Sequence, residues 1–247
     1  MKKTFNSILL AAILIPFISL RGENGDPATM PMNEFLACAR RANPVATYAM
    51  LNGTLQHRRR GKSSMTMPIY FGVILHPERT AGQIILDKKE GYLLGQAKGT
   101  GLTSVTPMAK NNSDLLGFVG VRASDLTMSF LFCKPEKEFE RETISGLIRC
   151  RVLYLNDTAN KEYIKVWISE KHAFPLQAEF YRYGEKEPFR LLEASGFTQK
   201  NDLYYIKKIR LEGPGWKTRI DFDSDSAEVD KLDPAKPPRV IKQLGGK

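Results

Sequence analysis

The C-terminal half of the chain alternates between apolar and polar residues over several consecutive segments. The alternation is strict in residues 218–223 and nearly so in residues 176–181. A period of two places one face of a strand against water and the other against apolar surroundings. Several such strands in series are typical of a meandering antiparallel sheet with one apolar face. The predicted strands span residues 144–155, 163–169, 176–183, 188–197, 203–212 and 217–223.

The N-terminal half predicts one helix followed by further strands. Apolar residues recur at helical spacing from Met32 to Ala39 and form one stripe. We therefore expect a helix over residues 26–43 that ends before Pro44. The strands that follow are expected at residues 45–55, 64–76, 81–86 and 91–94.

The connecting segments are less regular. Residues 100–113 are polar and contain glycine, which predicts a loop or flap, and residues 133–137 predict a charged connector. Residues 115–132 fit either a helical turn capped at Ser124 and Asp125 or an irregular segment. Residues 231–247 carry three prolines and predict an extended strap with a loose end.

The apolar positions of the predicted strands are candidates for the lining of a hydrophobic cavity. A one-sided sheet with too few helices to cover it is expected to keep such a cavity, and an apolar cavity binds apolar ligands. The alternative is an ordinary filled core. The candidate lining residues are Leu51, Met65, Met67, Ile69, Phe71, Val73, Ile84, Leu86, Val166, Ile168, Phe180, Phe197, Ile220 and Phe222.

The first residues are typical of a secretory signal peptide. Lys2 and Lys3 precede a nearly continuous apolar run over residues 7–20, and polar residues follow it. We expect a leader over residues 1–22 and one domain over residues 23–247. An uncleaved membrane anchor is the alternative, although the run is short for a bilayer span. The protein is therefore expected to be exported, to the periplasm of a bacterium.

The net charge is +10, and about +7 stays after the expected loss of Lys2, Lys3 and Arg21. A basic exported protein is expected to meet anionic lipid, lipopolysaccharide or an acidic protein surface, and no nucleic acid. The alternative is a basic surface that serves solubility alone. The strongest basic feature is the turn over residues 56–62, whose candidate patch for anionic lipid or a partner is Arg58, Arg59, Arg60 and Lys62.

The sequence favours no catalytic or metal chemistry. Its three cysteines and three histidines lack metal-ligand spacing, and no G-x-S-x-G motif is present. We therefore expect no enzyme activity, no metal and no cofactor. In an exported chain Cys133 and Cys150 are the plausible disulfide pair, with Cys38 left over, and three buried thiols are the alternative.

The order of these segments resembles that of the outer-membrane lipoprotein-sorting proteins, the periplasmic carriers of the LolA and LolB type. The resemblance covers roughly residues 28–232. It rests on the spacing of several segments together, none of which is diagnostic alone. The matching segments are NGTLQHR at 52–58, PIYFGV at 68–73, ASDLTMSFL at 123–131, ISGLIRCRVL at 144–153, YIKVWIS at 163–169 and FPLQAEFY at 174–181.

The resemblance implies a mainly β (α+β) fold, a curved antiparallel half-barrel whose concave face is plugged by helices and loops. It implies a non-enzymatic, monomeric carrier that holds the acyl chains of lipoproteins or of another amphiphile. An inner-membrane donor and an outer-membrane acceptor would be its partners. The same fold also hosts regulatory modules that bind other proteins, so an interaction or envelope-sensing role is the alternative function.

Overall fold

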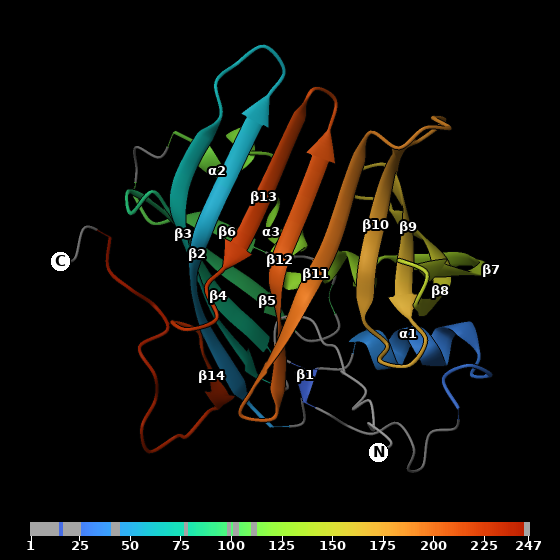
Figure 1. The fold of residues 1–247 in the computed structure, drawn as a ribbon. Coiled ribbons are helices and arrows are strands. Elements are labelled where there is room, and N and C mark those ends of the chain that lie inside the picture. The colour runs from blue at the N-terminus through green and yellow to red at the C-terminus, as the bar shows by residue number, and fades with distance from the viewer. Residues whose placement is uncertain are drawn as a thin grey trace, which may run out of the picture.

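The strands form one antiparallel sheet that curves around a small group of helices (Figure 1). The computed structural model describes residues 15–16, 26–40, 45–76, 79–97, 100, 104–109 and 113–244. Within these residues the sheet has 14 strands in the order β6-β5-β4-β3-β2-β13-β12-β11-β10-β9-β8-β7, with β1 beside β12 and β14 beside β2. The predicted curved, mainly antiparallel half-barrel is confirmed.

The helices are α1 (Met32–Arg40), α2 (Leu115–Phe118) and α3 (Ala123–Thr127), and η1 (Ser129–Phe132) is a 3-10 helix. The strands are β1 (Ile15–Pro16), β2 (Thr47–Arg59), β3 (Met65–His76), β4 (Arg79–Leu86), β5 (Glu90–Ala97), β6 (Ser104–Pro107), β7 (Lys134–Ile144), β8 (Ile148–Asp157), β9 (Glu162–Ser169), β10 (Pro175–Arg182), β11 (Arg190–Lys200), β12 (Leu203–Gly213), β13 (Trp216–Phe222) and β14 (Glu228–Lys231).

The helices that cover the concave face come from two places in the sequence. β6 and β7 are the two ends of the main strand order, and α2, α3 and η1 lie between them in the sequence. In Figure 1, α2 lies behind β2 and β3, α3 lies behind β12 and β13, and α1 lies across the ends of β9 and β10. We call α1, α2, α3 and η1 together the plug.

The basic turn predicted over residues 56–62 is shorter than expected. β2 continues through Arg59, and only the residues that follow it turn back toward β3. The reason is that Leu55 and His57 continue the buried face of β2, opposite Ile220 and Thr218 of β13. The alternation of apolar residues ends at Leu55, but the alternation of buried residues continues to His57.

The strand predicted over residues 144–155 is the second half of a hairpin. The expected charged connector at 133–137 belongs to β7, and the hairpin turns at Ser145 and Gly146, both of which have positive φ. β7 is an edge strand with mostly exposed residues, so no apolar alternation marks it. Charged residues on an edge strand are a common protection against pairing with other chains.

Two other segments differ in extent from the prediction. The expected loop over residues 100–113 contains β6, a short strand whose residues are all exposed. The first helix begins at Met32, because Asp26 starts a turn in which its carboxylate accepts a hydrogen bond from the amide of Ala28. Residues 115–132 are helical, in three short pieces.

The C-terminal strap is docked on the outer side of β3 and β4. Val240 is buried, and its carbonyl accepts a hydrogen bond of 2.6 Å from the hydroxyl of Tyr70. The side chain of Gln83 exchanges two hydrogen bonds with the backbone of Lys242. A Cβ at Gly72 would lie 2.6 Å from the carbonyl oxygen of Val240, so glycine permits this close approach.

The predicted signal peptide lies outside the described residues except for β1. Ile15 and Pro16 pair with Tyr204 and Leu203 at the end of β12. Export and cleavage of residues 1–22 stay predictions. Among the described residues, no helix is both long enough and apolar enough to cross a bilayer.

Candidate lipid-binding interior and its plug

The fourteen candidate lining residues belong to one hydrophobic cluster between the sheet and the plug. Met65 and Phe197 are partly buried against this cluster, and the other twelve are at most 4% exposed. A side chain with so little exposure has no space for a water molecule beside it. Within the described part of the chain, these twelve side chains are therefore packed against their neighbours.

The plug supplies the side chains that fill the interior. The ring of Phe130 meets that of Phe180 edge-on, with 5.9 Å between centroids, a favoured arrangement for buried aromatic pairs. Phe71 and Phe222 pair on neighbouring parts of the sheet at 6.5 Å. The plug residues that join the cluster include Phe35, Leu36, Leu116, Val119, Val121, Leu126, Met128, Phe130 and Leu131.

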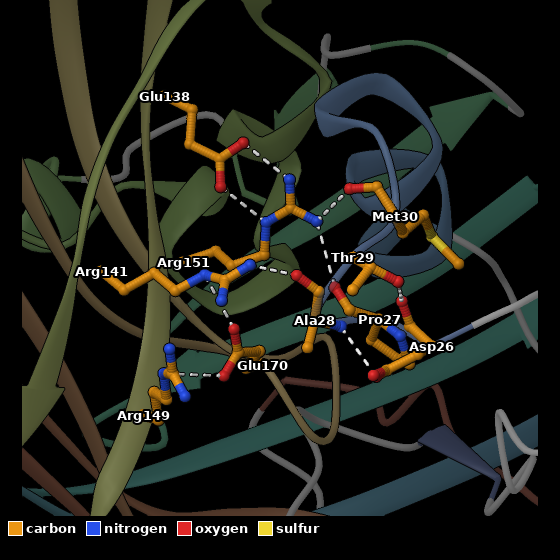
Figure 2. Close-up of polar contacts among 10 residues, drawn as sticks. All are labelled: Asp26, Pro27, Ala28, Thr29, Met30, Glu138, Arg141, Arg149, Arg151 and Glu170. Atoms are coloured by element: carbon orange, nitrogen blue, oxygen red, sulfur yellow. Dashed lines mark hydrogen bonds and ion pairs between the residues drawn. The ribbon is translucent and has the colours of Figure 1, made fainter.

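A buried arginine attaches the segment before α1 to the sheet (Figure 2). Arg151 of β8 is 3% exposed, and its Nε and Nη2 atoms each donate a 2.6 Å hydrogen bond to the carboxylate of Glu138. Its Nη1 donates to the carbonyls of Met30 and Pro27. Its guanidinium lies 4.4 Å from the ring centroid of Phe35 in α1. Every nitrogen of this guanidinium thus has a partner.

Further arginines surround the same attachment. Arg141 donates a hydrogen bond to the carbonyl of Ala28, and Arg141 and Arg149 both pair with the carboxylate of Glu170 (Figure 2). At the other end of α1, Arg40 donates to the backbone carbonyls of Leu131 and Cys133. The segment before α1 is therefore bonded to the sheet, and α1 itself is bonded to η1.

A second buried ion pair holds α3. Asp125 is 0% exposed and pairs with Arg190 at the start of β11, whose side chain is 3% exposed. The same carboxylate accepts a 2.6 Å hydrogen bond from the amide of Arg122, which closes the N-terminus of α3. The side chain of Arg122 forms two hydrogen bonds with Glu162 of β9.

Hydrogen bonds from Arg59, His57 and Thr218 hold α2 to β2 and β13 without a carboxylate. Arg59 donates a 2.7 Å hydrogen bond to the carbonyl of Phe118 and also donates to Nε2 of His57. Because that ring nitrogen accepts, Nδ1 of His57 carries the proton and donates to the hydroxyl of Thr218. Thr218 in turn donates to the carbonyl of Val119. Burial and the nearby charge of Arg59 lower the pKa of His57 below its ordinary value.

The carboxylate of Glu90 fixes the residues that precede α2. It accepts hydrogen bonds from the amides of Ser113 and Leu115 and from the hydroxyls of Ser113 and Tyr92. Burial alone would raise the pKa of Glu90, but these hydrogen bonds lower it to about 2. The group therefore stays ionised and bonded at physiological pH.

The predicted basic patch is divided by the strand geometry. Arg59 lies on the plug side of β2 and stacks on Phe118, with its guanidinium 4.3 Å from the ring centroid. Arg58, the residue before it, lies on the opposite face of β2, since side chains alternate along a strand. Arg60 and Lys62 are exposed in the turn. Contact of Arg58, Arg60 and Lys62 with lipid or a partner stays a prediction.

The predicted disulfide between Cys133 and Cys150 is not present, because all three cysteines are free thiols. The β7–β8 pairing explains why. Cys133 precedes Lys134, which lies opposite Asn156, whereas Cys150 lies opposite Glu142. At about 3.3 Å per strand residue, the two cysteines lie on the order of 25 Å apart along the hairpin. Burial raises the pKa of Cys133 to about 12 and that of Cys150 to about 11.

Three glutamates alternate along β7, Glu138, Glu140 and Glu142, and such a pattern on an edge strand is expected to face water, but this edge is only partly solvated. Glu138 binds Arg151, and Glu142 accepts hydrogen bonds from Trp167 and Lys165. A bulge between Phe139 and Glu142 interrupts the pairing register of β7. Glu140 is exposed, as expected.

The charged residues that attach the plug were not among the sequence candidates. Arg122 pairs with Glu162 and Asp125 with Arg190 across 40 and 65 positions, and Arg151 pairs with Glu138 across the β7–β8 hairpin. One signal was available, because Arg151 directly precedes the apolar residues 152–155 in a predicted strand. Among the described residues, no group of three or more His, Cys, Asp or Glu side chains is placed to hold a metal ion.

Three solved structures share the fold of this chain. A DUF1329 family protein from Desulfovibrio piger has a TM-score of 0.58 and 15% identity, covering 81% of this chain and 93% of the other. An outer membrane lipoprotein-sorting protein domain from Vibrio parahaemolyticus, described as putative, has a TM-score of 0.57, 15% identity and coverage of 81% and 94%. A LolA superfamily protein from Nitrosomonas europaea has a TM-score of 0.51, 12% identity and coverage of 81% and 94%.

The chain thus has the LolA-like fold, a curved antiparallel sheet around a helical plug. No protein-family model and no curated protein matches its sequence. The likeness to the solved structures therefore concerns the fold.

Proposed function

We propose that the protein is an exported, non-enzymatic carrier that holds acyl chains of lipoproteins or of another amphiphile between the sheet and the plug. The observation that carries this proposal is a continuous apolar surface on the concave face, covered by short segments rather than by a second layer of long elements. Each buried CH2 group contributes about 0.8 kcal/mol, so an acyl chain of moderate length binds usefully and reversibly.

Because the described residues of the interior are packed against one another, binding requires part of the plug to move. The α2–α3 segment is the part we expect to move, since its helices have four and five residues. Helices this short are not stable alone and depend on their attachments. An acyl chain would replace the contacts of Leu116, Val119 and Leu126 with the sheet.

The first test is mass spectrometry of organic extracts of the protein, purified without detergent from an exporting bacterial host. The proposal predicts stoichiometric fatty acid, phospholipid or lipopeptide. A second arm measures the rate at which cis-parinaric acid, a fluorescent acyl probe, is taken up. Asp125→Asn is expected to accelerate uptake, and Arg149→Met, which changes only a surface ion pair, is expected to leave it unchanged.

The alternative is a regulatory or interaction module of the same fold. The packing of the described interior residues favours it, because a filled core leaves no preformed space for a ligand. A clean organic extract together with no fluorescence change on adding the acyl probe would support this alternative and contradict the carrier proposal.

A further inference from the structure

A cleft rich in arginine lies beside the α2–α3 segment. It has a volume of about 360 Å³, which is within the usual size range of small-molecule sites. Residues 117–122 form one wall, and the ends of β2, β10, β11 and β13 form the others. Its lining includes Arg59, Arg122, Arg182 and Arg190, and no acidic side chain is among its lining residues.

Each of these four guanidinium groups is held against a phenylalanine ring. Arg59 lies over Phe118 at 4.3 Å from the ring centroid, and Arg182 lies over Phe189 at 4.7 Å. Arg122 and Arg190 both lie over Phe180, at 5.6 Å and 4.8 Å. Stacking fixes the planar groups before a ligand arrives and reduces the entropy that binding must overcome.

The cleft also has donors that the protein itself does not use. Arg190 is almost fully buried, and its Nη2 bonds Asp125 and the carbonyl of Gly120, but its Nη1 has no hydrogen-bond partner. A buried guanidinium nitrogen without an acceptor is costly. Arg59 bonds only neutral groups among the described residues.

The charges of the cleft are only partly compensated. Arg190 pairs with Asp125, Arg122 with Glu162, and Arg182 with Glu185 at 3.4 Å in an exposed i,i+3 pair. Exposed pairs of this kind contribute little, so Arg182 is available to a ligand. Arg59 adds a further positive charge near the same wall. An anion with several acceptor oxygens satisfies these donors, and arginine forks match the geometry of phosphate.

We propose that this cleft binds the phosphate group of the amphiphile whose acyl chains enter the interior. The acyl part rests on the proposed carrier function, whereas the phosphate part rests on the cleft alone. The geometry links the two, because residues 117–122 form a wall of the cleft and also contribute Val119 and Val121 to the core. A headgroup in the cleft therefore lies beside the segment that an acyl chain displaces.

Isothermal titration calorimetry on the full chain, delipidated after purification, tests the proposal with three probes. They are dihexanoyl phosphatidic acid, inorganic phosphate and dihexanoyl phosphatidylcholine, whose phosphate is a diester shielded by choline. The proposal predicts that phosphatidic acid binds most tightly. Phosphate alone is expected to bind more weakly and to compete with it. Phosphatidic acid binding is also expected to weaken as salt is added.

One double variant in the cleft and a matched control locate the site. The double variant Arg59→Gln, Arg182→Gln is expected to weaken phosphatidic acid binding by about tenfold or more, because two charged donors are lost. The control double variant Arg210→Gln, Arg219→Gln removes the same charge from exposed positions outside the cleft, and its affinity should stay within about twofold of the wild type. Thermal unfolding confirms that both variants fold.

The outcomes separate the phosphate proposal from the carrier proposal. Equal affinity of the two double variants, or no binding of phosphatidic acid and phosphate, would overturn the cleft site while leaving acyl binding open to the extraction test. If inorganic phosphate binds and the cleft double variant weakens its binding, but phosphatidic acid does not bind, the ligand is free phosphate. That result would overturn the lipid-headgroup proposal. Cleft-dependent phosphatidic acid binding would support the proposal even where a purified sample contains no acyl ligand.

Discussion

Helix α1 and the α2–α3 segment cover the same concave face, but arginines attach them in different ways. At α1, Arg151 has a partner for every nitrogen and bonds the backbone directly. At α3, Arg190 leaves Nη1 without a partner, and one oxygen of Asp125 is also unsatisfied. One attachment is complete and the other leaves bonding capacity for something else. We infer that α1 is a fixed part of the fold and that the α2–α3 segment is the part that opens.

The largest expected effect comes from breaking the complete attachment. Arg151→Met leaves Glu138 and two backbone carbonyls without their donor and should lower the free energy of unfolding by about 3–5 kcal/mol. Arg149→Met is the control, because it changes a pair in which the arginine is 63% exposed, and it should cost at most about 1 kcal/mol. Urea denaturation measures both. Similar losses for the two variants would show that Arg151 is not a special attachment.

The α2–α3 attachment is expected to give a smaller global effect and a larger local one. Asp125→Asn keeps an oxygen for the amide of Arg122 but removes the charge opposite Arg190. The free energy of unfolding should fall by about 1–3 kcal/mol. Amides of residues 115–127 should exchange at least about tenfold faster, because local opening needs less free energy than global unfolding. Amides of α1 should not change.

Hydrogen exchange followed by mass spectrometry reads both segments in one experiment. Glu185→Gln serves as the control, since it removes an exposed partner of Arg182 and should leave exchange unchanged. If Asp125→Asn accelerates exchange in α1 as well as in the α2–α3 segment, the plug opens as one unit. That result would contradict the distinction between a fixed α1 and an opening α2–α3 segment.

The strands could be predicted from the sequence because alternation is local. Thr218 to Phe222 shows its period of two within a few residues, and the structure places these residues in β13. The attachments of the plug could not be predicted in this way. Arg190 and Asp125 are 65 positions apart and Arg122 and Glu162 are 40 apart, so no short pattern joins them.

The candidate site was predicted in part for a related reason. The lining positions follow from alternation, but alternation does not say what covers them. Leu116, Val119 and Leu126 fill the interior from a segment whose sequence fits both a helical turn and an irregular structure. The extent of β7 was also missed, because an exposed edge strand such as Lys134–Ile144 has no apolar face to reveal it.

A glycine beside the cleft gives a sharper test of how tightly the α2–α3 segment is packed. Gly120 has a φ of +72°, and a Cβ there would lie 2.5 Å from the ring of Trp216. Gly120→Ala should therefore destabilise the protein by about 1–2 kcal/mol from the backbone conformation alone, plus the cost of moving the ring. Thermal unfolding measures the total.

Gly146→Ala is the matched control for the backbone cost. Gly146 has a similar φ of +68°, but nothing lies within 4 Å of its Cβ position. The difference between the two variants isolates the contact with Trp216. If the two variants are equally destabilised, the segment makes room for the new methyl group beside Trp216 at no cost. If Gly120→Ala is far more destabilised than Gly146→Ala, the result argues against opening at this end.

The smallest expected effect is a pH dependence at α2. Because the pKa of His57 is lower in the folded protein than in the unfolded chain, the unfolded chain binds more protons at acidic pH. The stabilisation by neutral His57 is fully present above about pH 6.5 and is lost as the pH falls toward the lowered value. Protonation also prevents Nε2 from accepting the hydrogen bond from Arg59.

Exchange of the amides in residues 115–121 should therefore accelerate modestly between pH 7 and pH 5, after correction for the intrinsic rate. His57→Gln should remove this dependence. His172→Gln is the control, since burial and Lys171 lower the pKa of His172 to about 4 but it lies in the turn between β9 and β10. If only His172→Gln removed the pH dependence of exchange, the titrating group would be His172, and the assignment to His57 would be wrong.

The central claim is that an acyl chain enters by displacing the α2–α3 segment while α1 stays in place. The most direct measurement is hydrogen exchange of the full chain with and without saturating cis-parinaric acid. The account predicts altered exchange in residues 115–127 and unchanged exchange in residues 32–40. No change in either segment at a concentration where the probe is bound, or an equal change in both, would contradict it.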